Sequence, residues 1–363
     1  MRPPLEPVTF GELPGWAADD PAEVIPALAR CARHVIHVKP YRTGALGLAC
    51  DDLLLALRAA EQAQGLAPAA ARRFFEDRFL PFRIASPGFV TGYYEPELAV
   101  SAVRTARYCY PIYRRPDDLI DIDHANKPAG MDPYFAFARS GAGGISEYFD
   151  RRAIDQGALE ARGLEIAFAE SRIDLFFVHI QGAARLIYAD GRRGRITYAA
   201  KTGHPFTPIG RLLIERSELA REAVTMATIR AWLEAHPDQV DELLWQNRSY
   251  IFFRETPANN DSLGPVAAAK VPLSSGRSLA VDRTIHTFAT PIFVSAPDLT
   301  HLDEGKPFRR LMLAQDTGSA IVGPARGDIF TGSGVEAGQL AGSIKHEAAF
   351  YVLIPKTAAE RFL

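Results

Sequence analysis

The N-terminal 80 or so residues have apolar positions at the spacing of α-helices. A first helix is predicted after Asp20-Pro21, because apolar side chains recur every three or four residues at Val24, Leu28, Cys31 and Val35. A second helix is expected from Asp51 to the breakers Gly65 and Pro68. A third carries Ala71, Phe74, Phe75 and Phe79, and Pro81 stops it. No catalytic pattern lies on these helices, so we interpret them as scaffold.

From residue 88 onward the pattern changes to short apolar or alternating runs between Gly and Pro. Strands are predicted at 88–97, 108–113, 164–169, 175–180, 181–186, 196–199, 249–254, 279–281, 291–294, 311–314, 319–322 and 349–354. Helices are expected at 150–161, 217–235 and 238–245, with a long loop at 119–144. The connections among the later strands lack helical period, which favours compact barrels over a doubly wound sheet.

Composition narrows the class of protein. The chain has 363 residues, 47% hydrophobic and 23% charged, with a formal net charge of −2. This is typical of a globular protein and provides no basic field for nucleic acid. No run of about 18 apolar residues predicts a membrane helix. The opening Met1-Arg-Pro-Pro lacks the apolar core of a signal peptide, so we expect either a cytoplasmic protein or one whose export segment is absent from this chain.

The three cysteines do not predict a metal site. Cys31, Cys50 and Cys109 form no C-x-x-C pair and have no His cluster nearby. Buried free thiols are the common outcome for such residues, and a bridge between Cys31 and Cys50 is the alternative in an oxidising compartment.

The common catalytic motifs are absent from the sequence. There is no G-x-G-x-x-G opening a helix, no P-loop, no H-E-x-x-H and no G-x-S-x-G. The remaining candidates are acids beside glycine turns, namely Glu95, Asp282, Asp316 and Asp328. Polar and aromatic residues accompany them: Thr91, Tyr93, Gln181, Lys201, Ser249 and Tyr250. Carboxylates, amides and aromatic rings together are typical of carbohydrate sites.

The stretch from Leu311 to Gly334 holds two of these acids. The apolar runs 311–314 and 320–322 are predicted as buried strands, and each leads to an acid, Asp316 or Asp328. Partial burial would raise the pKa of such a carboxylic acid and favour a proton donor. Asp beside Gly is more often a turn former, so spacing alone leaves both interpretations open.

Several segments together resemble the MltA family of lytic murein transglycosylases. In chain order they are Thr91-Gly-Tyr-Tyr-Glu-Pro96, Gln181-Gly-Ala with Arg185-Leu186, Gly203-His-Pro-Phe-Thr-Pro-Ile-Gly-Arg211, Asn247-Arg-Ser-Tyr-Ile-Phe-Phe253, Ala314-Gln-Asp-Thr-Gly-Ser-Ala-Ile-Val-Gly323 and Gly327-Asp-Ile-Phe-Thr-Gly-Ser-Gly334. The last two are the most specific. The helical N-terminus carries only a general likeness.

The resemblance implies a mainly β fold with N-terminal helices. It places a double-ψ β-barrel catalytic domain in residues 1–97 and 247–363, and a smaller inserted β-barrel domain in residues 98–246. It also implies that the glycan strand binds in the groove between the two domains.

The resemblance assigns the catalytic acid to Asp328 and makes Asp316 its neighbour. Family members cleave the β-1,4 bond between N-acetylmuramic acid and N-acetylglucosamine and leave a 1,6-anhydromuramyl end. One acid can suffice because the nucleophile is the C6 hydroxyl of the sugar itself, which is already tethered beside the reacting carbon. No metal or other cofactor is implied.

The same resemblance, with residue chemistry, suggests which side chains meet the glycan. Thr91, Tyr93 and Gln181 would contact sugars or acetamido groups, and Lys201 and Arg326 would meet anionic lactyl or peptide carboxylates. Ser249 and Asp282 complete the substrate-binding candidates. Many relatives have an Ala-Gly-Gln-Asn type segment where this chain has Ala199-Ala-Lys-Thr202, which leaves the role of Lys201 open.

The implied partner is the glycan strand of peptidoglycan. The resemblance also implies that the protein is periplasmic, and we expect it to be a monomer. Association with the outer membrane is left open, because this chain has no lipobox cysteine. Two other classes remain to be tested. One is an endoglucanase-type hydrolase on the same kind of barrel, and the other is a non-catalytic glycan-binding protein of the cell wall. A cytoplasmic metabolic enzyme is a third, weaker interpretation.

Overall fold

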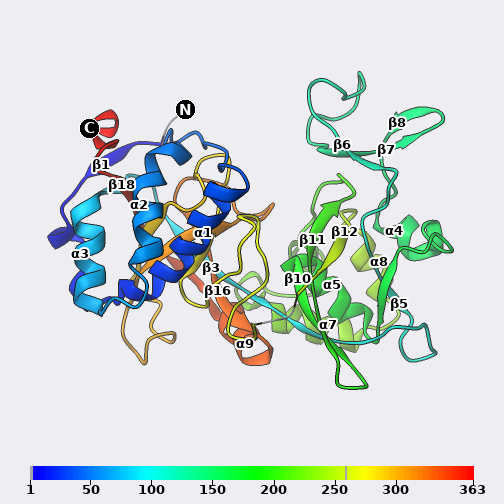
Figure 1. Cartoon of the computed structure of the whole chain (residues 1–363). Coiled ribbons are helices and arrows are strands. Elements are labelled where there is room, and N and C mark those ends of the chain that lie inside the picture. Colours follow the sequence, from blue (N-terminus) through cyan, green and yellow to red (C-terminus); the bar gives the residue numbers. More distant parts are fainter. Residues whose placement is uncertain (1–2, 258–259) are drawn as a thin grey trace. The chain divides into compact units, whose positions relative to one another are not determined.

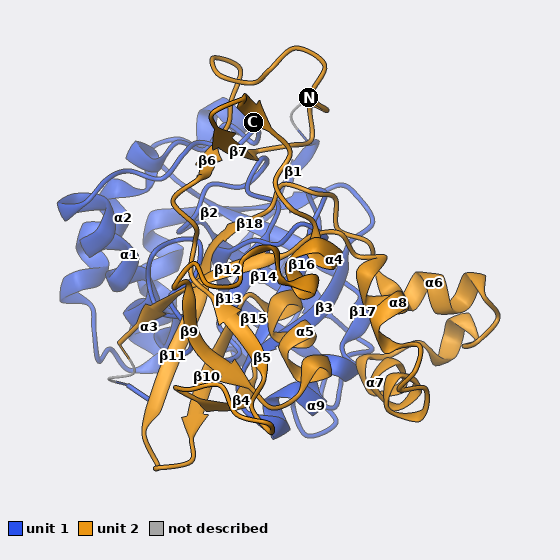
Figure 2. Cartoon of the chain, turned by 90° about the vertical axis from the view of Figure 1, so that its right-hand side faces the viewer, with its two compact units in different colours: residues 1–94, 260–363 blue, residues 95–259 orange. Residues whose placement is uncertain are grey.

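The chain folds into two compact units, each with its own hydrophobic core. The computed structural model describes residues 3–257 and 260–363. Unit 1 consists of residues 1–94 and 260–363, and unit 2 of residues 95–259, so unit 2 is inserted into unit 1 (Figures 1 and 2). The described residues of the N-terminal half of unit 1 and those of its C-terminal half share one large core.

Unit 1 begins with the predicted helices. They are α1 (Ile25–His37), α2 (Cys50–Gln62) and α3 (Pro68–Arg78), preceded by three short 3-10 turns at Phe10–Glu12, Trp16–Ala18 and Pro21–Val24. Asp20 accepts a hydrogen bond from the backbone N–H of Ala22, as its predicted capping role requires. The third predicted helix is one residue too long, because Phe79 already belongs to a strand that also contains Pro81.

A nine-stranded sheet forms the rest of unit 1. Its strands are β1 (Leu5–Pro7), β2 (Phe79–Ile84), β3 (Phe89–Glu95), β13 (Ser278–Val281), β14 (Pro291–Ala296), β15 (Phe308–Asp316), β16 (Arg326–Ser333), β17 (Lys345–Glu347) and β18 (Ala349–Pro355). They lie in the order β1-β2-β18-β14-β15-β13-β16-β3-β17. Helix α9 (Val335–Ser343) follows β16, and a 3-10 turn (Ala359–Phe362) ends the chain.

Unit 2 contains two sheets and several short helices. The larger sheet has the order β12-β11-β10-β4-β9-β5, and the smaller one the order β6-β7-β8. The strands are β4 (Glu97–Ser101), β5 (Tyr110–Tyr113), β6 (Leu119–Asp121), β7 (Phe137–Gly141), β8 (Gly144–Ser146), β9 (Glu165–Ala169), β10 (Ala183–Tyr188), β11 (Arg193–Lys201) and β12 (Ile251–Thr256). The helices are α4 (Arg151–Ala153), continued by a π-helical turn at Ile154–Ala158, and α5 (Arg172–Gln181), α6 (Ile209–Glu215), a 3-10 turn at Arg221–Ala223, α7 (Met226–Ala235) and α8 (Val240–Trp245).

The mainly β architecture with N-terminal helices is confirmed, but the strand pairings form open sheets where closed barrels were predicted. The sheet of unit 1 has β1 and β17 at its edges. In unit 2, a single parallel bridge between Arg114 and Phe253 joins the segment after β5 to the other edge strand, β12. The two edges of this sheet are therefore joined by an isolated bridge, and they do not pair in the continuous ladder that would close a barrel.

Several predicted elements are wrong. Residues 175–180, an apolar run predicted as a strand, lie inside α5, whose start is capped by Ser171. Residues 319–322 form no strand, and Val322 is 71% exposed. The predicted loop 119–144 contains β6 and β7. The predicted helix 150–161 ends early, where Gly157 adopts a positive φ of 100°, and 217–235 is helical only in part.

Two further findings concern cysteines and membranes. Cys31, Cys50 and Cys109 are all free, and the first two are buried. Within residues 3–257 and 260–363, no helix has both the length and the apolar character needed to cross a membrane.

Candidate active site

Strand β13 brings the two predicted acids to the same level of the sheet. Ala280 pairs with Asp316 of β15 on one side and with Asp328 of β16 on the other. Residues directly opposite one another in a sheet project to the same face, and two strand spacings separate Cα atoms by about 10 Å. The two acids are therefore neighbours through β13, although they are twelve positions apart along the chain.

Asp328 lies within β16 and is held by a chain of two hydrogen bonds. The Thr91 hydroxyl donates to Oδ1 of Asp328 at 2.6 Å. The Arg326 guanidinium donates to the oxygen of that hydroxyl, also at 2.6 Å. A hydroxyl has one hydrogen to donate, so the bond from Arg326 directs the hydrogen of Thr91 toward Asp328.

The surroundings of Asp328 favour its protonated form. Burial in the protein raises the pKa of Asp328 to about 6, and the charge of Asp316 acts in the same direction. The hydrogen bond from Thr91 and the charge of Arg326 oppose this rise. Asp328 can therefore carry a proton near neutral pH and lose it within the same reaction cycle.

Asp316, at the end of β15, has a different environment. One of its oxygens accepts hydrogen bonds from the backbone N–H groups of Thr317 and Ala268, at 2.9 and 3.1 Å. The other accepts one from the Tyr93 hydroxyl at 3.1 Å. Burial raises the pKa of Asp316, and these three donors lower it in part. Three donors to one carboxylate fix its orientation, whereas Asp328 has one.

Tyr93 connects strand β3 to Asp316. Its ring packs against Phe330, with ring centroids 5.3 Å apart. Burial and the two nearby carboxylates raise the pKa of Tyr93 well above its ordinary value, so the phenol stays protonated and acts as a donor. The preceding Gly92 lets α9 approach β3 closely, because a Cβ there would lie 2.7 Å from the Cα of Ala341.

Asp282 is engaged by the protein itself. Its carboxylate accepts hydrogen bonds from the backbone and hydroxyl of Thr284, at 3.0 and 2.6 Å, and from the backbone N–H of Gly323 at 2.9 Å. Burial acts to raise the pKa of Asp282, but these bonds outweigh it and lower the pKa. The contact with Gly323 ties Asp282 to the loop between β15 and β16.

The other three predicted site residues belong to unit 2. Gln181 is the partly exposed last residue of α5. Lys201 ends β11, with its ammonium 3.4 Å from the Tyr134 hydroxyl and 5.0 Å from the centre of that ring. Ser249 is buried, and its carbonyl accepts a hydrogen bond from Arg151 at 2.6 Å. The structure thus brings together Thr91, Tyr93, Arg326, Asp316 and Asp328, while Gln181, Lys201 and Ser249 lie in the other unit.

Sequence reasoning missed three contributors to the site. Ala280 sets the register of both acids, Ala268 donates its N–H to Asp316, and the charge of Lys270 acts to lower the pKa of Asp316. Strand β16 was missed as well. No residue type marks these roles, because each depends on which strands become neighbours in the sheet.

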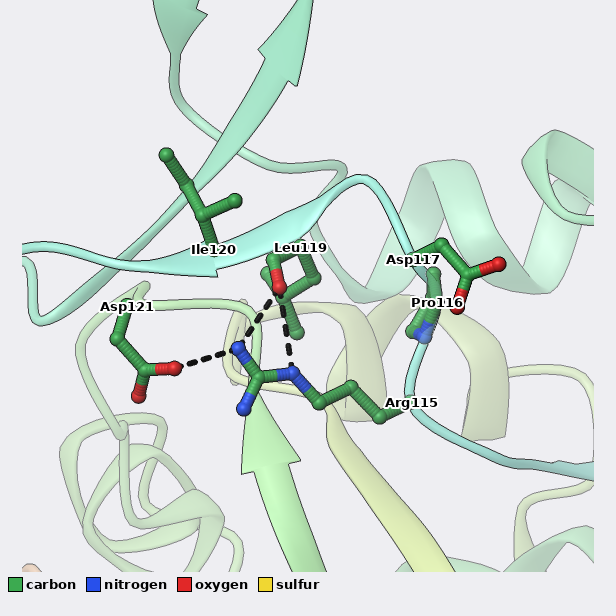
Figure 3. A pocket seen from close by; sticks show the side chains of 6 residues that line it. All are labelled: Arg115, Pro116, Asp117, Leu119, Ile120 and Asp121. Atoms are coloured by element: carbon green, nitrogen blue, oxygen red, sulfur yellow. Dashed lines mark hydrogen bonds and ion pairs between the residues drawn. The ribbon is translucent and has the colours of Figure 1, made fainter.

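In the described part of the chain, no group of three or more His, Cys, Asp and Glu side chains is placed to hold a metal ion. A hollow of about 490 Å³ lies in unit 2 along residues 115–121 (Figure 3). Its Arg115 donates to the Leu119 carbonyl and to Asp121, and none of the predicted site residues lines it.

Known families and proteins share both the sequence and the fold. Residues 89–254 match the MltA specific insert domain, and residues 277–354 match the 3D domain, which includes Asp282, Asp316 and Asp328. A lytic murein transglycosylase of the membrane-bound kind from Agrobacterium tumefaciens has a crystal structure with 59% identity and a TM-score of 0.95, covering 99% of this chain and 100% of that one. The structure of Escherichia coli MltA with bound chitohexaose has 27% identity and a TM-score of 0.66, covering 98% and 95%.

A curated relative gives the same result over a shorter range. The protein named membrane-bound lytic murein transglycosylase A from Escherichia coli (strain K12) is 34% identical over 273 residues, which is 74% of this chain and 65% of the relative. The chain thus spans about two thirds of the length of that relative. The two domain matches define a protein that combines a 3D domain with an inserted domain. The chain belongs to the MltA family, as its motifs predicted.

Proposed function

We propose that this protein is a lytic transglycosylase of peptidoglycan. It cleaves the β-1,4 bond between N-acetylmuramic acid and N-acetylglucosamine and leaves a 1,6-anhydromuramyl end. Membership of the MltA family and the names of its relatives support the reaction, and the chitohexaose bound to one of them supports a glycan substrate. The observation that carries the proposal is Asp328, a half-buried acid whose pKa is raised to about 6.

The first chemical step needs a proton donor. Protonated Asp328 donates to the glycosidic oxygen as the bond from C1 to that oxygen breaks, and the leaving sugar takes the proton. The developing positive charge at C1 is stabilised by the carboxylate charge that remains nearby on Asp316. Burial of both acids strengthens that electrostatic contribution.

The second step needs a base. The C6 hydroxyl of the muramyl residue attacks C1 and transfers its proton to the Asp328 carboxylate, which restores the starting enzyme. The tethered hydroxyl is the nucleophile, so a second carboxylate is not needed to activate water. The hydrogen bond from Thr91 stabilises the carboxylate form of Asp328 between the two steps.

The neighbouring residues have proposed roles that follow from their contacts. Thr91 and Arg326 orient the Asp328 carboxylate, and Tyr93 with the two backbone N–H groups orients Asp316. Asp282 holds the loop before β16 through Gly323. Gln181 and Lys201 present polar groups at the surface of unit 2 and are proposed to contact the glycan, and the buried Ser249 to shape that surface.

The decisive experiment compares products from purified peptidoglycan by mass spectrometry. The wild-type protein should release muropeptides with 1,6-anhydromuramyl ends. Asp328→Asn, which keeps the shape of the side chain and removes the titrating proton, should lower the rate by at least about a thousandfold. Asp298→Asn removes an exposed acid from the same unit and should leave the rate unchanged.

The outcomes separate the competing functions. New reducing ends in place of anhydro ends would identify a hydrolase of the endoglucanase type. Glycan binding without any turnover by the wild-type protein would identify a non-catalytic cell-wall protein. Turnover that persists in Asp328→Asn would show that the acid has been wrongly assigned.

The proposed reaction also implies a location and a state of assembly. Its substrate is the cell wall, so we propose a periplasmic protein that works as a monomer and associates with the outer membrane. The word membrane-bound in the relatives' names supports association with a membrane. Fractionation of cells with an antibody, and light scattering of the purified protein, test these two statements.

A further inference from the structure

A cavity of about 170 Å³ lies inside unit 2, among residues that the proposed cleavage reaction does not use. One ordered water needs roughly 15 Å³ of such space, so the cavity can hold a small organic molecule. Strand β5, the helical turns at 151–155 and helix α5 contribute to its wall. Apolar and aromatic side chains form much of this lining, including Tyr110, Leu175, Phe176 and Leu244.

The cavity is lined by a buried cation that has no acidic partner. Arg151 is only 3% exposed, and its guanidinium donates to the carbonyls of Asn247 and Ser249 and to Nδ1 of His179. Among the residues that the structure describes, no carboxylate lies within ion-pair distance of it. These bonds use three of the five N–H groups, so one remains on each terminal nitrogen.

His179 adds an unsatisfied donor to the same wall. Arg151 can only donate, so Nδ1 of His179 must accept, and in the neutral ring the hydrogen then resides on Nε2. Burial lowers the pKa of His179 well below its ordinary value, and the nearby charge of Arg151 acts in the same direction, which keeps the ring neutral. His179 is 4% exposed, and its Nε2 has no hydrogen-bond partner. A buried N–H without an acceptor costs free energy that a ligand oxygen would recover.

The remaining charges of the wall are paired. Arg172 contacts two carboxylates, that of Asp155 at 2.7 Å and that of Asp241, and Arg104 contacts Glu160 at 3.6 Å. Of the three arginines in the lining, Arg151 is therefore the one whose charge has no ion-pair partner. A group with a single negative charge and two acceptor oxygens complements it.

We propose that this cavity binds small monocarboxylates. The carboxylate accepts hydrogen bonds from the two remaining N–H groups of Arg151 and from Nε2 of His179, and the apolar body lies against Tyr110, Leu175 and Leu244. A planar carboxylate matches the fork of a guanidinium, whereas a phosphate dianion would bring a second charge without a partner. The site is a property of unit 2 and does not depend on the proposed cleavage reaction.

Cys109 provides a test on the unmodified protein. It lines the cavity and is the one partly exposed cysteine, since Cys31 and Cys50 are buried. Benzoate should slow the alkylation of Cys109 by iodoacetamide in a saturable way, with half-protection at about millimolar concentration. Sodium chloride at equal ionic strength should have no such effect. Equal rates in benzoate and chloride would overturn the proposal, and protection by inorganic phosphate alone would overturn the assignment of a carboxylate ligand.

Substitutions at Arg151 and Arg152 test whether the Arg151 guanidinium contributes to benzoate binding. Titration calorimetry with benzoate should show binding at least about tenfold weaker in Arg151→Met, because the charge-assisted hydrogen bonds are lost. The matched control is Arg152→Met, which removes the same charge from the adjacent, exposed position and should bind like the wild type. Equal loss in both variants would overturn a specific role for Arg151.

His179 gives a second variant in case Arg151→Met does not fold. His179→Phe retains the ring and removes the donor, and it should bind benzoate several-fold more weakly. In the wild-type protein, the ¹⁵N–¹H signal of His179 Nε2 should move as benzoate is added. An unmoved signal together with unchanged affinity in His179→Phe would refute the site.

Discussion

The two acids of the site differ in the number of donors that hold them. Asp316 accepts three hydrogen bonds from the protein, whereas Asp328 accepts one, from Thr91. The acid with fewer fixed donors retains acceptor capacity for a substrate, and burial raises its pKa to about 6. This difference supports the proposal that Asp328 exchanges the proton and that Asp316 gives electrostatic support.

The pH dependence of kcat/KM should shift in opposite directions in two variants. Asp328 must be protonated to begin the reaction, so the rate falls as pH rises through its pKa. The charge of Asp316 raises that pKa, so Asp316→Asn should move the alkaline limb to lower pH. The hydrogen bond from Thr91 lowers it, so Thr91→Val should move the limb to higher pH. Shifts in the same direction would contradict the roles given to both residues.

The raised pKa of Asp328 should also cost stability. The folded state binds this proton more tightly than the unfolded chain, so stability falls as pH rises from about 4 to about 6. Asp328→Asn removes that dependence and should be more stable than the wild type at pH 7 and above, by up to about 3 kcal/mol. Thermal melts at several pH values test this, and the advantage should vanish below about pH 4. An equal advantage at all pH values would point to another cause.

Strand β13 is the element on which the site depends. It pairs with β15 in parallel and with β16 antiparallel, and this places Asp316 and Asp328 opposite the same residue. Arg277, directly before β13, fixes its start through a buried ion pair with Asp19 at 2.8 Å. Asp19 also accepts a hydrogen bond from the backbone of Leu311, in β15, at 2.7 Å. The N-terminal segment thus helps hold the two strands in register.

Breaking this ion pair should destabilise unit 1. Asp19→Ala leaves the Arg277 cation buried and partly unpaired, so we expect a loss of about 3–5 kcal/mol in urea unfolding. The double variant Asp19→Ala/Arg277→Met should recover part of the loss, because no charge is then stranded. Glu23→Gln changes the exposed partner of the same arginine and should cost less than about 1 kcal/mol. Equal costs for Asp19→Ala and Glu23→Gln would contradict this account.

Element prediction succeeded where local signals agreed and failed where only length and apolar character were available. Asp20 and Pro21 begin a 3-10 turn that Asp20 caps, and the helical period after them forms α1 from Ile25. Residues 175–180 are apolar except for His179, which suits a buried strand or a buried helix equally, and they form part of α5. Strand β16 was not predicted, because Arg326-Gly-Asp-Ile is only half apolar. The segment is a strand because its backbone pairs with β13.

At the scale of the whole molecule, the two units have separate cores. Unit 2 contains a buried acid, Glu95, which is 0% exposed and forms ion pairs with Arg185 at 3.1 Å and with Arg195 at 2.8 Å. Glu95 is the last residue of β3, at the point where the chain enters unit 2, and Arg185 and Arg195 lie in strands β10 and β11. The cluster therefore attaches the first residue of unit 2 to the larger sheet of that unit.

Removing the charge of Glu95 should therefore loosen unit 2 selectively. Glu95→Gln removes the fully buried charge that faces Arg185 and Arg195 and should destabilise the unit by about 3–5 kcal/mol. Hydrogen exchange followed by mass spectrometry should show faster exchange within residues 95–257 and unchanged exchange in residues 3–94. Glu97→Gln alters an exposed acid two residues away and should change neither region. Equal acceleration in both units would show that they unfold together.

The sequence by itself determined the family, the mainly β class and the N-terminal helices, and it predicted the two acids of the proposed site. These follow from local order, since caps, periodicity and motif residues lie close together along the chain. The tertiary structure alone decided that β13 separates β15 from β16, that Thr91 and Arg326 serve Asp328, and that Asp282 holds a loop. It also decided that Arg151 and His179 share a cavity. Such contacts join residues 28 to 237 positions apart, and no local pattern encodes which of the distant strands and helices will meet.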